Sequence, residues 1–153
     1  MLKSFDTEYG RIAPFICSDM AFLSTIQQAG RNNVDILIVP ASDWKEMTLL
    51  AAKTAIVRGV ENGSNIIRHT NNGMSIVSNV KGCVLAQADY FQSDTKTFSA
   101  QVAMKGRFTL YSYIGNLFVY LCNLYLLGSF MLPKMKRLNK LPKAKNRNFI
   151  RKG

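Results

Sequence analysis

The chain has 153 residues, enough for one modest domain, and 48% of them are hydrophobic, which excludes a largely disordered protein. Its formal net charge of +11 is uneven, because residues 134–153 hold nine Lys or Arg and no Asp or Glu. Three cysteines and one histidine, with no CxxC or HxxxH pair, argue against a disulfide framework and predict no metal site.

Residues 1–107 alternate between short apolar runs and helical patterns, which predicts a layered α/β domain. The run VDILIVP at 34–40 is continuous and rich in β-branched residues, as is typical of a strand buried on both faces. Apolar residues recur at helical spacing over 45–62, and Gly63 follows as a candidate C-cap. The predicted strands are 11–17, 34–40, 66–68, 74–79, 83–87 and 98–103, and the predicted helices are 22–30 and 45–62.

Residues 108–133 form an uncharged segment of 26 residues between Arg107 and Lys134. A transmembrane helix needs about 20 mainly apolar residues, so this segment is long enough to span a bilayer. We therefore predict one membrane-spanning helix at 108–133; the alternative is a buried helix in a soluble core. By the positive-inside rule, the basic tail 134–153 would be cytoplasmic, and residues 1–107 would lie on the outer face of the cell membrane.

The basic tail itself has three ordinary explanations: an anionic membrane surface, nucleic acid, or a solvated tail without a partner. Its only aromatic residue is Phe149, whereas nucleic-acid binding favours basic residues interleaved with stacking aromatics. Attraction to the anionic cytoplasmic leaflet explains the tail more simply, because the tail follows the predicted span directly. We predict a membrane partner and no nucleic acid.

Cys17 ends an apolar run and is followed by Ser18, Asp19 and a predicted helix. A side chain at a strand-to-helix turn projects from the edge of the sheet, where N–H groups at a helix start can stabilise an oxyanion or a thiolate. On this evidence alone, Cys17 is either a nucleophile or a small buried hydrophobic residue.

Three sequence blocks carry a resemblance to a known family. They are GRIAPFICSDMAF around Cys17, AGRNNVDILIVPASDW after it, and RGVENGSNIIRHTNNGMSIVSNVKGCVL further on. In this order they resemble the nucleophile segment and later blocks of the carbon–nitrogen hydrolase (nitrilase) superfamily. The R-x-T-N-x-G-x-S pattern and a following span are most similar to the apolipoprotein N-acyltransferase family. The resemblance covers residues 5–132 and implies the C-terminal half of an α-β-β-α nitrilase-type sandwich, followed by one transmembrane helix.

The resemblance implies a Glu–Lys–Cys triad, with Cys17 as the nucleophile that forms a thioester, and no cofactor. It also implies a phospholipid as acyl donor and the N-terminal amine of a lipoprotein as acceptor. The family's Glu and Lys lie well upstream of the cysteine, but only 16 residues precede Cys17 here. We therefore expect a fragment that is inactive alone and lacks the N-terminal half as its partner. The alternatives are a membrane-tethered amidase or nitrilase and a non-catalytic membrane protein.

Several polar residues near these blocks are candidates for supporting the site. Asp19 could assist the reaction or cap the helix after Cys17. Asp43 and Trp44 could line an acyl pocket, or form a turn with a packing aromatic. Arg58 and Glu61 are expected to be a structural pair, because they are three residues apart on one helix. The full set of predicted supporting residues is Ser18, Asp19, Asp43, Trp44, Arg68, Thr70 and Asn71.

Overall fold

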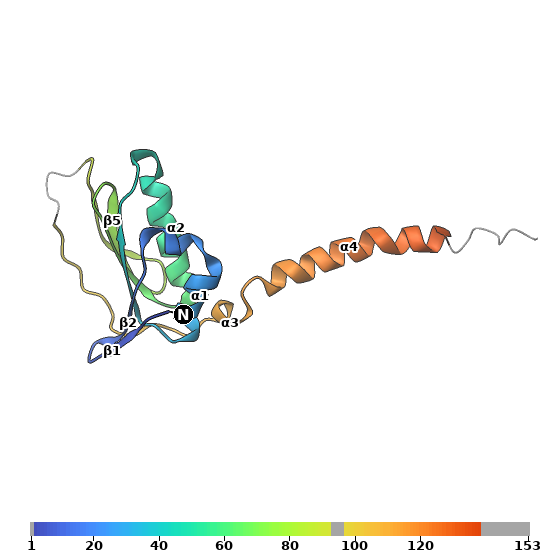
Figure 1. Ribbon diagram of the computed structural model, residues 1–153, viewed down its shortest axis with the longest axis horizontal. Helices are drawn as coiled ribbons and strands as arrows, with labels where there is room; N and C mark the ends of the chain where they lie inside the picture. The colour runs from blue at the N-terminus through green and yellow to red at the C-terminus, as the bar shows by residue number, and fades with distance from the viewer. Residues whose placement is uncertain (1, 93–96, 139–153) are drawn as a thin grey trace, which may run out of the picture. The chain divides into compact units, whose positions relative to one another are not determined.

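The computed structural model describes residues 2–92 and 97–138 (Figure 1). Its centre is a mixed six-stranded sheet in the order β1-β2-β3-β4-β5-β6. Strands β2, β3 and β4 are parallel, and β1, β5 and β6 are each antiparallel to a neighbour. The strands are β1 Phe5–Thr7, β2 Gly10–Pro14, β3 Ile36–Ala41, β4 Asn65–Thr70, β5 Met74–Ser78 and β6 Val84–Asp89. The predicted α/β class is confirmed.

Two helices make the crossovers between the parallel strands. Helix α1, Leu23–Arg31, joins β2 to β3, and α2, Thr48–Asn62, joins β3 to β4. Both lie on the same face of the sheet (Figure 1). Short 3-10 turns precede them, η1 at Cys17–Ala21 and η2 at Lys45–Met47.

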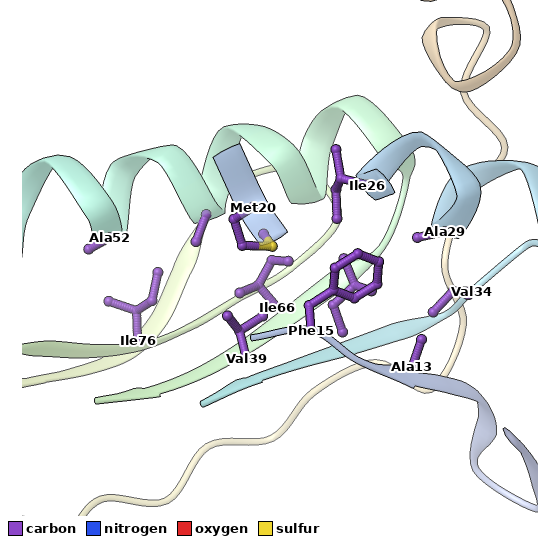
Figure 2. Close-up of a cluster of buried hydrophobic side chains, with 12 residues drawn as sticks. Ala13, Phe15, Met20, Ile26, Ala29, Val34, Val39, Ala52, Ile66 and Ile76 are labelled. Carbon is purple, nitrogen blue, oxygen red and sulfur yellow. The ribbon is translucent and has the colours of Figure 1, made fainter. Parts of the chain in front are cut away.

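The hydrophobic core fills the space between these helices and the sheet (Figure 2). Strand β3 contributes Leu37 and Val39, both fully buried, while Ile38 between them is 42% exposed. The expectation that this strand is buried on both faces is therefore met only in part within the described residues. On the face that points away from α1 and α2, Ile36 is 8% exposed, whereas Ile38 is not buried.

The structure differs from the predicted strands in three main places, besides shifts of one or two residues at other strand ends. Strand β2 ends at Pro14, so Cys17 begins the η1 turn instead of ending the strand. Residues 98–103 form no strand, and side-chain bonds hold Ala103 at the end of this segment and Gly106 just after it. The Asn65 amide donates to the Ala103 carbonyl at 2.9 Å, and Gly106 N–H donates to Asp35 Oδ1 at 2.7 Å. The three-residue strand β1, whose residues are all exposed, was not predicted.

The segment predicted to span the membrane is divided in the structure. Helix α3, Tyr111–Ile114, belongs to a first compact unit that ends at Gly115. The buried Ser112 carbonyl accepts a 2.9 Å hydrogen bond from Arg31, which ties α3 to α1.

The second unit begins at Asn116 and contains α4, Leu117–Leu138. Large apolar side chains of this helix are exposed, among them Phe118, Leu124, Tyr125 and Phe130. Over the described residues, no helix meets the length and apolarity that a membrane crossing requires. The predicted membrane span is therefore not confirmed, and most of the basic tail 134–153 lies outside the described residues.

Candidate active site

The three parallel strands end at one edge of the sheet, where polar residues from different parts of the chain meet. Cys17 lies just beyond β2, Asp43 just beyond β3, and Arg68 near the end of β4. The carboxyl ends of parallel strands are a usual location for ligand sites in α/β sheets. These strand ends therefore define the candidate site.

Cys17 is the first residue of η1 and is half-buried. The start of this turn is held by Asp19, whose carboxylate accepts the Ile16 N–H at 2.9 Å. Asp19 N–H in turn donates to the Ile16 carbonyl at 2.7 Å. These bonds show Asp19 capping the start of η1. They fix the backbone that carries the Cys17 side chain.

Asp43 and Arg68 form a buried ion pair beside Cys17. Arg68 Nη2 lies 2.6 Å from Asp43 Oδ1 and 2.9 Å from Oδ2, and each side chain is only 2% exposed. Arg68 Nη1 also donates to the Met74 carbonyl at 3.0 Å. Cys17 Sγ lies 3.9 Å from Asp43 Oδ1, within reach of a weak S–H hydrogen bond. The pair thus links β4, the loop after β3 and the cysteine.

The remaining predicted supporting residues do not gather around the thiol in the same way. Thr70 is buried, and its N–H donates to Ser75 Oγ at 3.0 Å. Asn71 is exposed, and its N–H donates to the Ala41 carbonyl at 3.1 Å. Ser18 is exposed, and Trp44 is 80% exposed. Trp44 is therefore not a packing aromatic within the described chain.

An apolar hollow of about 210 Å³ opens next to Cys17. Its wall is formed by η1, η2, the first turns of α2, and Arg68; the lining residues are Cys17, Met20, Ala21, Met47, Leu50, Ala51, Thr54 and Arg68. Met47 and Leu50 are largely exposed. The contribution of Met47 and Leu50 was not predicted, because nothing in a local pattern shows that the start of α2 faces the cysteine.

Arg58 has a positioning role that the sequence only partly suggested. It pairs with Glu61 at 2.6 Å, as expected for residues three apart on a helix. Its Nε also donates to the Met20 carbonyl at 3.2 Å, which ties α2 to η1. This second bond holds the turn that carries Cys17 against the helical layer.

Metal-binding clusters are absent from the described part of the chain, where no three His, Cys, Asp or Glu side chains come together. The arrangement offers the chemistry of a half-buried thiol beside an apolar hollow and a carboxylate that is paired with an arginine.

Comparison with known proteins gives the family context of this arrangement. The chain is 31% identical over 135 residues to the apolipoprotein N-acyltransferase of Haemophilus influenzae, a match that covers 82% of this chain. Its sequence resembles the apolipoprotein N-acyltransferases. The chain spans 24% of the length of the curated relatives that it matches. No family model matches the sequence.

Solved structures add the fold. Saccharomyces cerevisiae Nit3, a member of the nitrilase superfamily, superimposes with a TM-score of 0.53 at 24% identity, over 57% of this chain and 36% of Nit3. A variant of the amidase from a Nesterenkonia species superimposes with a TM-score of 0.53 at 18% identity, over 57% of this chain and 37% of the amidase. That structure shows covalent addition of an acetamide moiety at the amidase's active-site cysteine. The chain therefore has a nitrilase-like fold.

Proposed function

We propose that the chain is part of a membrane-associated acyltransferase of the carbon–nitrogen hydrolase type, with Cys17 as its nucleophile. The observation that carries this proposal is the position of Cys17, where a half-buried thiol faces both an apolar hollow and the Asp43 carboxylate. An apolar hollow suits the hydrocarbon end of an acyl group, and a thiol suits covalent transfer. The similarity to an apolipoprotein N-acyltransferase supports the same reaction.

The reaction has two steps, which share the thiol. The Cys17 sulfur attacks the ester carbonyl of a phospholipid, a C–S bond forms, and the C–O bond to glycerol breaks as that oxygen takes a proton. The free N-terminal amine of a lipoprotein then attacks the thioester carbonyl, a C–N bond forms and the C–S bond breaks. The departing sulfur takes up the proton that the amine loses, which restores the thiol. Each attack passes through an oxyanion, which needs a positioned donor, and each needs a base.

The base and the oxyanion donor are proposed to come from the rest of a longer enzyme. The resemblance implies a Glu and a Lys for these roles, and neither Lys3 nor Glu8 belongs to the segments that form the site. The chain matches only 24% of the length of its relatives. Ile38, on the face of the sheet opposite α1 and α2, is 42% exposed, in a strand whose sequence is typical of burial on both faces. A second layer packed on that face would bury Ile38 and complete the sandwich.

Membrane anchoring is the second part of the proposal. The exposed apolar side chains of α4 include Phe118, Tyr125 and Phe130, each more than 70% exposed. A helix that is apolar on all sides is stable against lipid or inside a larger protein, and both proposed substrates are lipid-linked. We propose that α4 anchors the enzyme in the cell membrane, with the catalytic unit on the outer face and the basic tail in the cytoplasm.

A hydrolase is the second candidate, because an amidase is among the similar structures. It would pass the same thioester to water instead of to an amine. The two functions differ in whether adding an amine acceptor increases the turnover of the acyl-enzyme.

Trapping the acyl-enzyme tests the proposal. The chain is expressed in detergent, alone and together with the part of the Haemophilus influenzae relative that it does not match. A labelled phospholipid is added, and mass spectrometry locates the acyl adduct. We expect an adduct on Cys17 in the combined sample alone, none with Cys17→Ser, and an unchanged yield with Cys83→Ser, since Cys83 is an exposed thiol outside the site.

Each of the other outcomes contradicts a separate part of the proposal. An adduct on the isolated chain would show that no further polypeptide is needed. Absence of an adduct in both samples would contradict acyl transfer by Cys17.

A further inference from the structure

Burying the ion pair next to Cys17 costs desolvation free energy, and the proposed two-step reaction does not by itself explain why the pair is there. Asp43 and Arg68 lie 25 residues apart in the sequence, and both side chains are 98% removed from solvent. Burying two charges is often no more stabilising than burying an apolar pair of the same size. A buried pair at a strand end therefore suggests a role in the site.

The geometry at one oxygen connects the pair to the thiol. Asp43 Oδ1 accepts from Arg68 Nη2 at 2.6 Å and lies 3.9 Å from Cys17 Sγ. Asp43 Oδ2 also accepts from Arg68 Nη2, at 2.9 Å. Arg68 Nη2 therefore engages both oxygens of the carboxylate that lies beside the thiol. Arg68 lines the same hollow as Cys17.

We infer that Asp43 and Arg68 act together as positioning residues for Cys17, with Asp43 orienting the thiol and Arg68 balancing the charge of the carboxylate. This inference deepens the proposed function and rests on Cys17 being its nucleophile. A carboxylate alone at this distance would repel a thiolate, while an unpaired guanidinium would attract it. The intact pair neither repels nor attracts a thiolate strongly, so the thiolate can form when the base removes the thiol proton.

The other charged groups near η1 are the same in every variant of the test below, and several of them have partners of their own. Asp19 accepts from Ile16 N–H, Arg58 pairs with Glu61, and Arg31 donates to Ser112. No charged residue occurs within β3. The full set on the elements around η1 is Asp19, Arg31, Lys45, Glu46, Lys53, Arg58 and Glu61.

The test measures the pH at which alkylation of Cys17 by iodoacetamide reaches half its maximal rate, using the whole chain in detergent and mass spectrometry of each cysteine. Asp43→Asn leaves Arg68 unbalanced, so the midpoint is expected to fall by about one pH unit or more. Arg68→Gln leaves the carboxylate unbalanced, so the midpoint is expected to rise by a similar amount. The exposed Cys83 is the internal reference and should not move.

Matched controls come from the exposed pair Asp6–Arg11, with 2.7 Å between Asp6 Oδ1 and Arg11 Nε. The hydrogen bond from Arg11 holds the pKa of the Asp6 carboxyl below its usual value, so this too is an ionised pair. Asp6→Asn and Arg11→Gln make the same chemical changes away from Cys17, and the Cys17 midpoint is expected to stay unchanged in both.

Opposite shifts in the two single variants support the inference, because mere loosening of the fold would move both midpoints in the same direction. Shifts in one direction, or none, overturn it. A rise of the midpoint in Asp43→Asn would instead mark Asp43 as the base. If either single variant does not fold, the double variant decides. It restores charge balance, so an unchanged midpoint supports the inference and a shifted one overturns it.

Alkylation needs neither a phospholipid nor an amine, so this test is independent of acyl transfer. Opposite midpoint shifts combined with no acyl adduct would overturn the proposed function alone. An acyl adduct combined with midpoints that do not move would overturn only the role of the ion pair.

Discussion

At the scale of single residues, Asp43 is confined on several sides. Arg68 engages both of its oxygens, and Cys17 Sγ lies 3.9 Å from Oδ1. Gly73, in the turn after β4, is buried against the same carboxylate. A Cβ atom added to Gly73 would lie 2.6 Å from Asp43 Oδ2 and 3.0 Å from its Cβ. Because Arg68 fixes Asp43, the carboxylate cannot move aside without weakening the ion pair.

Gly73→Ala is therefore expected to lower the free energy of unfolding by about 1–3 kcal/mol, the usual cost of overpacking a buried site. Urea denaturation followed by circular dichroism measures the change. The control is Asn72→Ala in the same turn, where the exposed side chain predicts a change within about 0.5 kcal/mol. Equal stability of the two variants would show that Gly73 is not held by Asp43.

At the scale of elements, the end of α2 is joined to residues 107–109, just before α3. Gly63 ends α2 with a φ of 71°, the left-handed conformation predicted for a C-cap. The Gly63 carbonyl accepts from Arg107 N–H at 2.6 Å, and Thr109 Oγ1 donates to the Glu61 carbonyl at 2.6 Å. These bonds explain why residues 108–115 belong to the first unit and not to the following helix.

Gly63→Ala is expected to cost about 2–4 kcal/mol of unfolding free energy, since it combines left-handed backbone strain with overlap of the new methyl group and the Arg107 carbonyl. The matched control is Gly128→Ala in α4, where no atom lies within 4 Å of the added Cβ. Alanine has a higher helix propensity than glycine, so the Gly128→Ala variant is expected to lose no stability. A Gly63→Ala variant as stable as Gly128→Ala would contradict the packing of Arg107 on this cap.

At the scale of the whole molecule, the chain consists of two units with different surfaces. Among the residues whose burial is described, the core of the first unit runs from Ala13 to Ile76 and includes none from α4. The second unit, from Asn116, presents large exposed apolar side chains along its described helix. Folding and membrane attachment are therefore expected to be separable.

Ending the chain after Gly115 should leave the urea midpoint of the first unit unchanged and abolish its sedimentation with anionic phospholipid vesicles. A chain that ends after residue 133 is the control, because it keeps the apolar part of α4 and lacks the basic tail. It should still bind vesicles, with weaker preference for anionic lipid. Vesicle binding by the chain that ends after Gly115 would contradict anchoring by α4.

Much of the fold could be predicted because its signals are local. The helical spacing over 45–62 and the apolar run at 34–40 correspond to α2 and β3. The strand predicted at 98–103 failed because an apolar run becomes a strand only if a neighbouring strand edge pairs with it. Here the Asn65 side chain donates to the Ala103 carbonyl at the end of the segment, and the described sheet contains no strand from 98–103.

The sequence by itself determined the family resemblance, the α/β class and the choice of Cys17, because short ordered blocks and residue periodicity are properties of the linear chain. Only the tertiary structure decided that one oxygen of Asp43 lies next to both Arg68 and Cys17. It also decided that Met47 and Leu50 border the hollow beside Cys17. The physical reason is that these contacts depend on the parallel register of β3 and β4 and on the side of the sheet to which α2 returns. Both are set by packing between distant segments, for which no local pattern exists.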